Sequence, residues 1–189
     1  MMKTLLYTLL MISVFACNET ESPKQDQQNT TARAGDTSQK SIPSETKKWV
    51  GNTDIKINYT APAVRGRAIW GALVPYDKVW VTGAHNATTL EVGKAFKVGD
   101  KLIPAGKYSL FTIPGKDEWI VIINKNWEQH LADEYSAAED VQRISVKPRT
   151  NKVLTERLQY NIDQTGERTA RIIMSWAELS IIIPVEIRD

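Results

Sequence analysis

The sequence predicts an all-β domain, a sandwich or a partly closed barrel, with about ten mostly antiparallel strands and one short helix. Apolar and polar residues alternate in several segments, and this is the period of a strand with one buried face. Turn residues separate these segments at short intervals. Only residues 127–138 have helical spacing, with Leu131 and Tyr135 four positions apart.

The strands can be located in order along the chain. Residues 119–123 read WIVII and are apolar on both faces, which predicts a central strand that is covered on two sides. The other segments show alternation, which predicts one buried face for each of them. In chain order, these alternating segments are residues 55–59, 158–162, 170–176 and 179–187.

The predicted turns agree with these strands. Gly99 and Asp100 form a two-residue connection of the hairpin type, in which glycine supplies a positive φ. Residues 164–166, Gln-Thr-Gly, close a second hairpin between two long segments. Proline and glycine at residues 104–106 and 114–117 bound a strand between them.

The N-terminus resembles a secretion signal. Lys3 precedes a short apolar run at residues 5–15, which is too brief to cross a bilayer. Residues 14–17, Val-Phe-Ala-Cys, resemble the lipobox of bacterial lipoproteins, in which the cysteine is lipidated and becomes the new N-terminus. We therefore expect a signal peptide at residues 1–16 and lipidation of Cys17, the only cysteine. The alternative is ordinary cleavage nearby, which leaves Cys17 as a free thiol.

Residues 17–47 are expected to be the lipidated cysteine and a disordered tether, and residues 48–189 the β domain. Polar residues dominate the tether, so it cannot bury enough surface to offset its conformational entropy. A flexible chain of this length spans on the order of 30 Å. The expected location is the cell envelope, facing the periplasm or the exterior, with outer-membrane attachment through the lipid.

The charge of the chain argues against a nucleic-acid partner. The formal net charge is +2, and the basic residues are scattered instead of forming a stripe. The sequence also contains no Gly-x-Ser-x-Gly motif and no H-E-x-x-H motif, and we expect no cofactor and no metal. The expected partners are the membrane, through the lipid, and a small molecule, a glycan or an envelope protein.

Residues 66–84 read GRAIWGALVPYDKVWVTGA, and residues 104–115 read PAGKYSLFTIPG. Shorter motifs lie at 117–119 (DEW), 123–125 (INK), 140–143 (DVQR) and 146–148 (VKP). Together these motifs resemble the DUF2911 family, secreted or lipid-anchored bacterial proteins of undetermined function. The family pattern after Val79-Trp80 usually reads Arg-Thr-Gly-Ala-Asn-Glu-Ala-Thr, whereas this chain has Val81, His85 and Asn86 at the Arg, Asn and Glu positions. If those polar residues act in relatives, this chain has lost or altered that capacity.

His85 is the candidate for acid–base chemistry, because an imidazole titrates near neutral pH and can also bind a metal. The alternative is a loop histidine that is hydrogen-bonded to the backbone. Only His130 could act as a second imidazole, and it lies far along the chain. Catalysis requires a carboxylate or hydroxyl within reach of His85.

The candidate ligand-binding residues combine a cation, aromatic rings and small polar groups. Arg67, close to Arg65, could bind an anion through its guanidinium, or it could fix a strand end by pairing with an acid. Aromatic residues of this stretch, among them Trp70, Tyr76 and Trp119, could form a platform for a ligand or part of the core. The predicted ligand-binding set is Arg67, Trp80, Thr82, His85, Asn86, Thr88 and Tyr108.

These observations favour a binding module on a lipid anchor. The alternatives are a hydrolase that uses His85 with a nearby carboxylate and a purely structural envelope component. A binding module predicts an open cleft with an aromatic floor and no acid–base pair.

Overall fold

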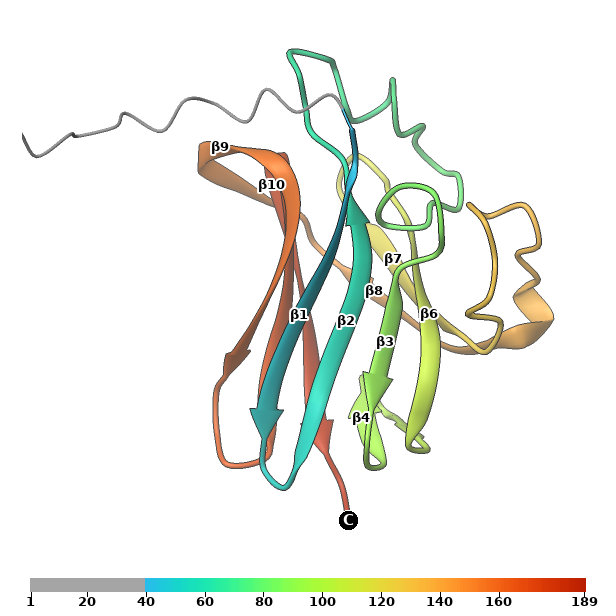
Figure 1. Ribbon diagram of the computed structural model, residues 1–189, viewed down its shortest axis with the longest axis vertical. Helices are drawn as coiled ribbons and strands as arrows, with labels where there is room; N and C mark the ends of the chain where they lie inside the picture. Colours follow the sequence, from blue (N-terminus) through green and yellow to red (C-terminus); the bar gives the residue numbers. More distant parts are fainter. Residues whose placement is uncertain (1–39) are drawn as a thin grey trace, which may run out of the picture. The chain divides into compact units, whose positions relative to one another are not determined.

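The computed structural model describes residues 40–189, which form two antiparallel sheets (Figure 1). One sheet has six strands in the order β1-β2-β3-β6-β7-β8, and the other has four in the order β5-β4-β10-β9. The strands are β1 Ile42–Val50, β2 Thr53–Ala61, β3 Thr89–Val92, β4 Phe96–Val98, β5 Lys101–Ile103, β6 Gly106–Ile113, β7 Trp119–Asn124, β8 Asp140–Val146, β9 Arg149–Gln164 and β10 Thr169–Ile187. The predicted sandwich-like all-β class is therefore confirmed.

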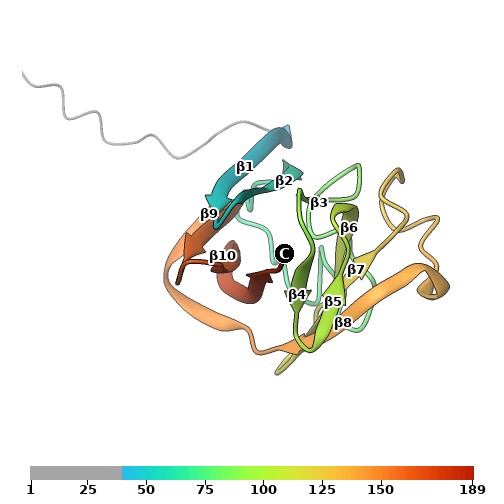
Figure 2. The ribbon, with the colours of Figure 1, turned by 90° about the horizontal axis from the view of Figure 1, so that it is seen from below.

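Viewed from below, the six-stranded sheet curves around β10 (Figure 2). The main core lies between the two sheets and takes inward residues from both. Ile55 and Ile57 of β2 and Ile181 and Ile183 of β10 are fully buried, as their period-two spacing predicts.

A smaller apolar cluster covers the outer face of the six-stranded sheet. It consists of Val81, Ala87, Phe111 and Ile122. Trp119 and Ile123 of β7 face the main core, while Ile122 faces this smaller cluster. The prediction that residues 119–123 are covered on both faces is therefore confirmed.

Both predicted hairpins are present. Val98 pairs with Lys101 across the β4–β5 turn, where Gly99 has a φ of 64°. This left-handed value is easily reached by glycine and is costly for most other residues. The β9–β10 hairpin turns at residues 165–168, with Gln164 paired to Ala170.

The expected start of the domain and the expected helix need correction. The domain begins earlier than residue 48, because β1 starts at Ile42 and pairs with β2 along its whole length. Residues 127–138 contain no α-helix; the only helical turn among residues 40–189 is a 3₁₀ turn at Ala137–Glu139. The helical spacing fails because Leu131 has a φ of 52° and bonds to another loop instead of to its own turn.

The two predicted C-terminal strands are one continuous strand, β10. A bulge at Ala177, where φ is 50°, shifts the register between Ser175 and Leu179. The bulge explains why buried positions change from even numbers before Trp176 to odd numbers after it.

The expected signal peptide, Cys17 and the tether up to residue 39 lie outside the described residues. Within residues 40–189, no helix is long and apolar enough to cross a membrane.

Candidate functional site

A pocket of about 340 Å³ lies at one end of the sandwich, and we call it the end pocket. The loop between β2 and β3 forms most of it. The other contributions are Ser41 just before β1, Leu131 of the β7–β8 loop and Trp176 of β10. Its basic side chains are Arg65, Arg67 and His85, and no carboxylate lines it. The other lining residues are Pro62, Leu73, Val74, Trp80, Val81, Gly83 and Ala84.

Tryptophans form the floor of the end pocket. Trp80 and Trp176 are stacked with ring centroids 5.8 Å apart, and both line the pocket. Trp70 packs edge-on against both of them and against the fully buried Trp119. The floor is thus the exposed margin of a cluster that is continuous with the main core. This continuity makes the floor rigid.

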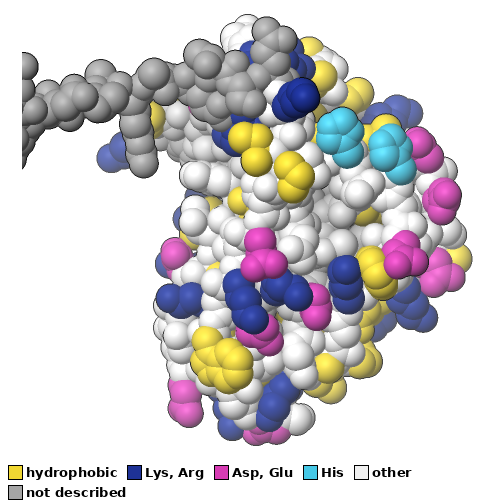
Figure 3. Space-filling view, viewed as in Figure 1, with side chains coloured by type: hydrophobic (Ala, Val, Ile, Leu, Met, Phe, Trp, Pro, Cys, Tyr) yellow, Lys and Arg dark blue, Asp and Glu magenta, His cyan; other side chains and the backbone are white. Residues whose placement is uncertain are grey.

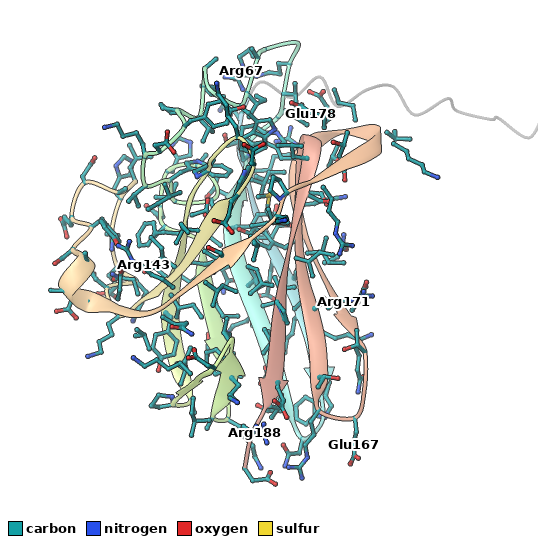
Figure 4. All side chains as sticks on the ribbon, turned by 180° about the vertical axis from the view of Figure 1, so that it is seen from behind. Arg67, Arg143, Glu167, Arg171, Glu178 and Arg188 are labelled. Carbon is teal, nitrogen blue, oxygen red and sulfur yellow. The ribbon has the colours of Figure 1, made fainter. Side chains whose placement is uncertain are left out.

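Arg67 has no acidic partner among residues 40–189. Its Nε donates to the Val64 carbonyl at 3.1 Å and its Nη2 to the Ala63 carbonyl at 2.6 Å. A guanidinium carries five N–H groups, so these two bonds orient it and leave three donors. Figure 4 shows Arg67 at the end of the domain opposite Arg188. The predicted alternative, a pair with an acid, is not what the structure contains.

His85 lies at the rim and has a φ of 62°. Its imidazole makes no hydrogen bond or ion pair with residues 40–189; its nearest aromatic contact is His130, at 6.5 Å between ring centroids. Figure 3 shows the two histidines side by side on one face. Glu178 lies at the same end of the domain (Figure 4), but it does not bond to His85. The acid–base pair that a His85-dependent hydrolase requires is absent from the described residues.

Backbone strain is concentrated around the end pocket. Arg65, Thr82, His85 and Leu131 all have φ between 51° and 62°, in the left-handed region that non-glycine residues rarely occupy. Arg65, His85 and Leu131 line the pocket, and Thr82 lies directly beneath its wall. Such conformations persist only where the surroundings impose them, and they are enriched at functional sites.

Hydrogen bonds with β9 hold the backbone around Arg65 in its left-handed conformation. The Val64 N–H donates to the Glu156 carbonyl at 2.7 Å, and the Arg65 N–H donates to the Glu156 carboxylate at 2.8 Å. Leu158 N–H donates to the Pro62 carbonyl at 2.9 Å. These bonds attach the turn on which Arg67 lies to β9 of the four-stranded sheet.

Thr82 and Thr88 do not reach the pocket, because both are fully buried. The Thr88 hydroxyl donates to the Thr82 carbonyl at 3.0 Å, and the Tyr160 hydroxyl donates to the same oxygen at 3.0 Å. The Thr82 hydroxyl lies 3.1 Å from that of Thr112. Their role is to hold the loop, so they are not ligand-binding residues of this pocket.

The structure brings together part of the predicted ligand-binding set. Arg67, Trp80 and His85 line the end pocket. Asn86 lines a different pocket on the outer face of the sheet. Tyr108 is inside the fold, where its hydroxyl donates to the Pro104 carbonyl at 3.0 Å and its ring packs on Phe96.

Sequence reasoning missed Trp176 and Leu131 as lining residues. Trp176 comes from β10, and the sequence signal near it is the change of the apolar positions from even numbers, such as Met174, to odd numbers, such as Ile181. Leu131 has no comparable signal, since its position depends on a loop-to-loop bond that no local pattern encodes.

The β7–β8 loop that supplies Leu131 is held by Asp140. Its carboxylate accepts from Tyr135 Oη at 2.8 Å, Arg143 Nε at 2.6 Å and Asn124 Nδ2 at 2.7 Å. Burial raises the pKa of the Tyr135 phenol, and its bond to Asp140 raises it further. The bond to Asp140 is also the main reason that the pKa of Arg143 is raised.

Residues 41–185 match the family described as "Protein of unknown function (DUF2911)". The chain belongs to the DUF2911 family. No curated protein and no solved structure matches it.

In this DUF2911 domain, His85 lines the end pocket together with the buried Val81, and Asn86 lines the neighbouring pocket.

Residues 40–189 contain no group of three His, Cys, Asp or Glu side chains that could hold a metal. What the end pocket offers is an aromatic floor, apolar walls and a cation with unused donors.

Proposed function

We propose that this DUF2911 domain is a binding module whose end pocket takes a small anionic molecule with an apolar body. The observation that carries the proposal is Arg67, a guanidinium oriented by two backbone carbonyls, without an acidic partner in residues 40–189, at the edge of an aromatic floor. A carboxylate or phosphate suits the remaining donors of such a group.

The shape and composition of the pocket support an apolar body for the ligand. Small-molecule sites are mostly apolar, with a few placed polar groups that fix the orientation. Here the partly exposed Trp80 supplies apolar surface, the buried Trp176 is stacked behind it, and Leu73 and Leu131 are exposed apolar residues at the rim. The lack of any lining carboxylate favours an anion over a cation.

We also propose that the domain acts at the cell envelope, held by a lipid on Cys17 through the segment that precedes Lys40. The signal-like N-terminus and the position of the single cysteine support this location. A lipid anchor would keep a binding module at the membrane surface, because buried methylenes give durable membrane affinity when two or more chains are present.

The charge requirement can be tested with two matched probes. Indole-3-acetate carries a carboxylate on an aromatic body, and indole-3-acetamide is its neutral analogue. In calorimetric titrations we expect the acid to bind the protein at least about tenfold more tightly than the amide, which corresponds to the loss of one charge-assisted contact. Equal affinity for the two probes, or no heat with either, would contradict the proposal.

Two variants complete the test. Arg67→Gln should bring the affinity for the acid down to that for the amide. Arg171→Gln is the matched control, since Arg171 is an exposed arginine of β10 far from the pocket (Figure 4), and it should leave the preference intact. A preference that survives in Arg67→Gln would assign the charge effect to another group.

A further inference from the structure

The exposed apolar side chains of the domain are concentrated at one end. Seven large apolar side chains are exposed within residues 40–189, and two of them, Trp49 and Leu102, lie beside the β1–β2 and β4–β5 turns. Figure 1 shows both turns at the end opposite the long β2–β3 loop. The other five lie at the end that carries this loop and the end pocket, and we call this group the apolar end. Its members are Ile42, Leu73, Leu131, Val153 and Leu154.

Val153 and Leu154 project from a bend in β9. Register with β10 is lost between residues 150 and 155, where four residues of β9 correspond to the single residue Glu178 of β10. The extra residues form the bend, in which the exposed fractions of Val153 and Leu154 are 78% and 54%. Figure 4 shows Glu178 at the same end of the domain as Arg67. Side chains as exposed as these two contribute little to the core, so their apolar surface is available to a partner.

The described chain also begins at the apolar end. Ser41 lines the end pocket, and Ile42 follows it as the first residue of β1. Arg157 Nη1 donates to the Lys40 carbonyl at 3.2 Å and to the Ala61 carbonyl at 2.7 Å. These bonds fix the start of the described chain beside the end of β2. A membrane anchor on the preceding segment would therefore hold the domain from its apolar end.

Basic side chains surround the apolar end. They are Lys40, Arg65, Arg67, Lys152 and Arg157. Nearby acids are Glu156, which already accepts from the Arg65 N–H at 2.8 Å, and Glu178. Further acids lie around the β6–β7 turn, away from β1, and they are Asp77, Asp117 and Glu118, with Lys78 and Lys116 among them. Figure 3 shows basic and apolar side chains together near the start of the described chain.

We propose that the apolar end docks on an anionic lipid bilayer, with Val153 and Leu154 in the headgroup region. The proposal rests on the membrane attachment proposed above and is independent of the ligand of the end pocket. A bilayer surface takes up exposed apolar side chains, and its anionic headgroups attract basic ones. The five apolar side chains come from four separate segments of the chain. A protein partner would need a surface complementary to all four, whereas a fluid bilayer adapts to them.

Hydrogen exchange on vesicles tests this orientation. The unlipidated full chain is coupled through Cys17, its only cysteine, to a maleimide lipid, so the result does not depend on natural lipidation. On vesicles of phosphatidylethanolamine with phosphatidylglycerol, amide exchange in residues 71–74 and 151–154 should slow by about fivefold relative to the uncoupled chain. This is the effect of about one lysine near an anionic surface. Residues 99–103 should exchange as before, and equal protection at both ends, or at neither, would overturn the proposal.

Two matched variants test the apolar contact. Val153→Ser combined with Leu154→Ser should leave the melting temperature unchanged, because both side chains are exposed, but should abolish the protection of residues 71–74 on vesicles. Leu102→Ser is the control, since Leu102 is 57% exposed at the opposite end, and it should keep that protection. Loss in both variants, or in neither, would overturn the assignment.

The lipid composition tests the charge. Vesicles of phosphatidylcholine alone lack anionic headgroups, so they should protect residues 71–74 and 151–154 several-fold less than vesicles with phosphatidylglycerol. Equal protection on the two compositions would overturn an anionic bilayer as the partner.

Discussion

The main-chain N–H of Leu131 donates a 2.6 Å hydrogen bond to the carbonyl of His85, and both residues have left-handed backbones. The adjoining residues Asn86 and His130 form an isolated bridge, and the Ala87 N–H donates to the Gln129 carbonyl at 3.0 Å. His85 and Leu131 line the end pocket, while Asn86 and His130 line a second pocket of about 420 Å³ on the outer face of the six-stranded sheet. This short pairing of two loops is therefore the partition between the two cavities.

The partition depends on Asp140, which anchors the loop that carries Leu131 and His130. Asp140→Asn removes the charge that accepts from Arg143 Nε and Tyr135 Oη, so we expect a loss of about 1–3 kcal/mol of unfolding free energy in denaturant titrations. The end pocket should lose affinity for its ligand as well. Asp163→Asn is the control, because its contact with Arg171 is exposed and 3.7 Å long. Equal stability in the two variants would show that Asp140 does not anchor the loop.

The tryptophan floor predicts a large effect at Trp119. Trp119 is fully buried, and its ring lies 4.8 Å from that of Trp70. Trp119→Ala should cost about 3–5 kcal/mol of unfolding free energy, because it empties a large volume beneath the end pocket. Trp49→Ala is the matched comparison, since the Trp49 side chain is 63% exposed and its loss should change stability little. Similar melting curves for the two variants would contradict the placement of Trp119 in the core.

The sequence was sufficient for the features that repeat with period two. Ile55, Ile57 and Trp119 occupy the strands and faces that alternation indicates, and the Gly99 turn has the expected left-handed glycine. Trp80 and Arg67 also meet in one pocket, because both belong to a single loop whose length and composition stand out. Such features depend on local patterns.

Features that depend on tertiary contacts were not predictable in this way. Thr82 and Thr88 look like polar partners for a ligand, yet they turn inward to satisfy the loop and Tyr160. The helical spacing of Leu131 and Tyr135 yields to the bond with His85 and to the contact of Tyr135 with Phe111. In both cases hydrogen bonds to distant residues outweigh a local preference of a few tenths of a kcal/mol per residue.

The first strand predicts how the chain tolerates truncation. A chain that begins at residue 40 retains all of β1 and should melt as the full protein does. A chain that begins at residue 48 lacks most of β1, which exposes the edge of β2 and removes the bond from Thr46 Oγ1 to the Tyr160 carbonyl at 2.9 Å. We expect a lower melting temperature for the second chain by calorimetry. Identical melting temperatures would mean that β1 adds nothing to stability.

Tyr160 predicts how stability depends on pH. Burial is the main cause that raises the pKa of its phenol well above the ordinary value, and the hydroxyl donates to the Thr82 carbonyl at 3.0 Å. A raised pKa means that the folded state favours the protonated phenol. Its contribution is therefore complete below about pH 10, where an unfolded tyrosine titrates, and is lost as the pH rises above that value.

Tyr160→Phe should separate these two effects. At neutral pH the variant should lose about 1 kcal/mol, because one hydrogen bond disappears while Thr88 still donates to the Thr82 carbonyl. Above pH 10 the gap between wild type and variant in unfolding free energy should narrow, since phenylalanine has no proton to lose. Urea titrations at pH 7 and at a pH above 10 measure both effects. A gap that stays constant with pH would contradict the buried, protonated phenol beneath the end pocket.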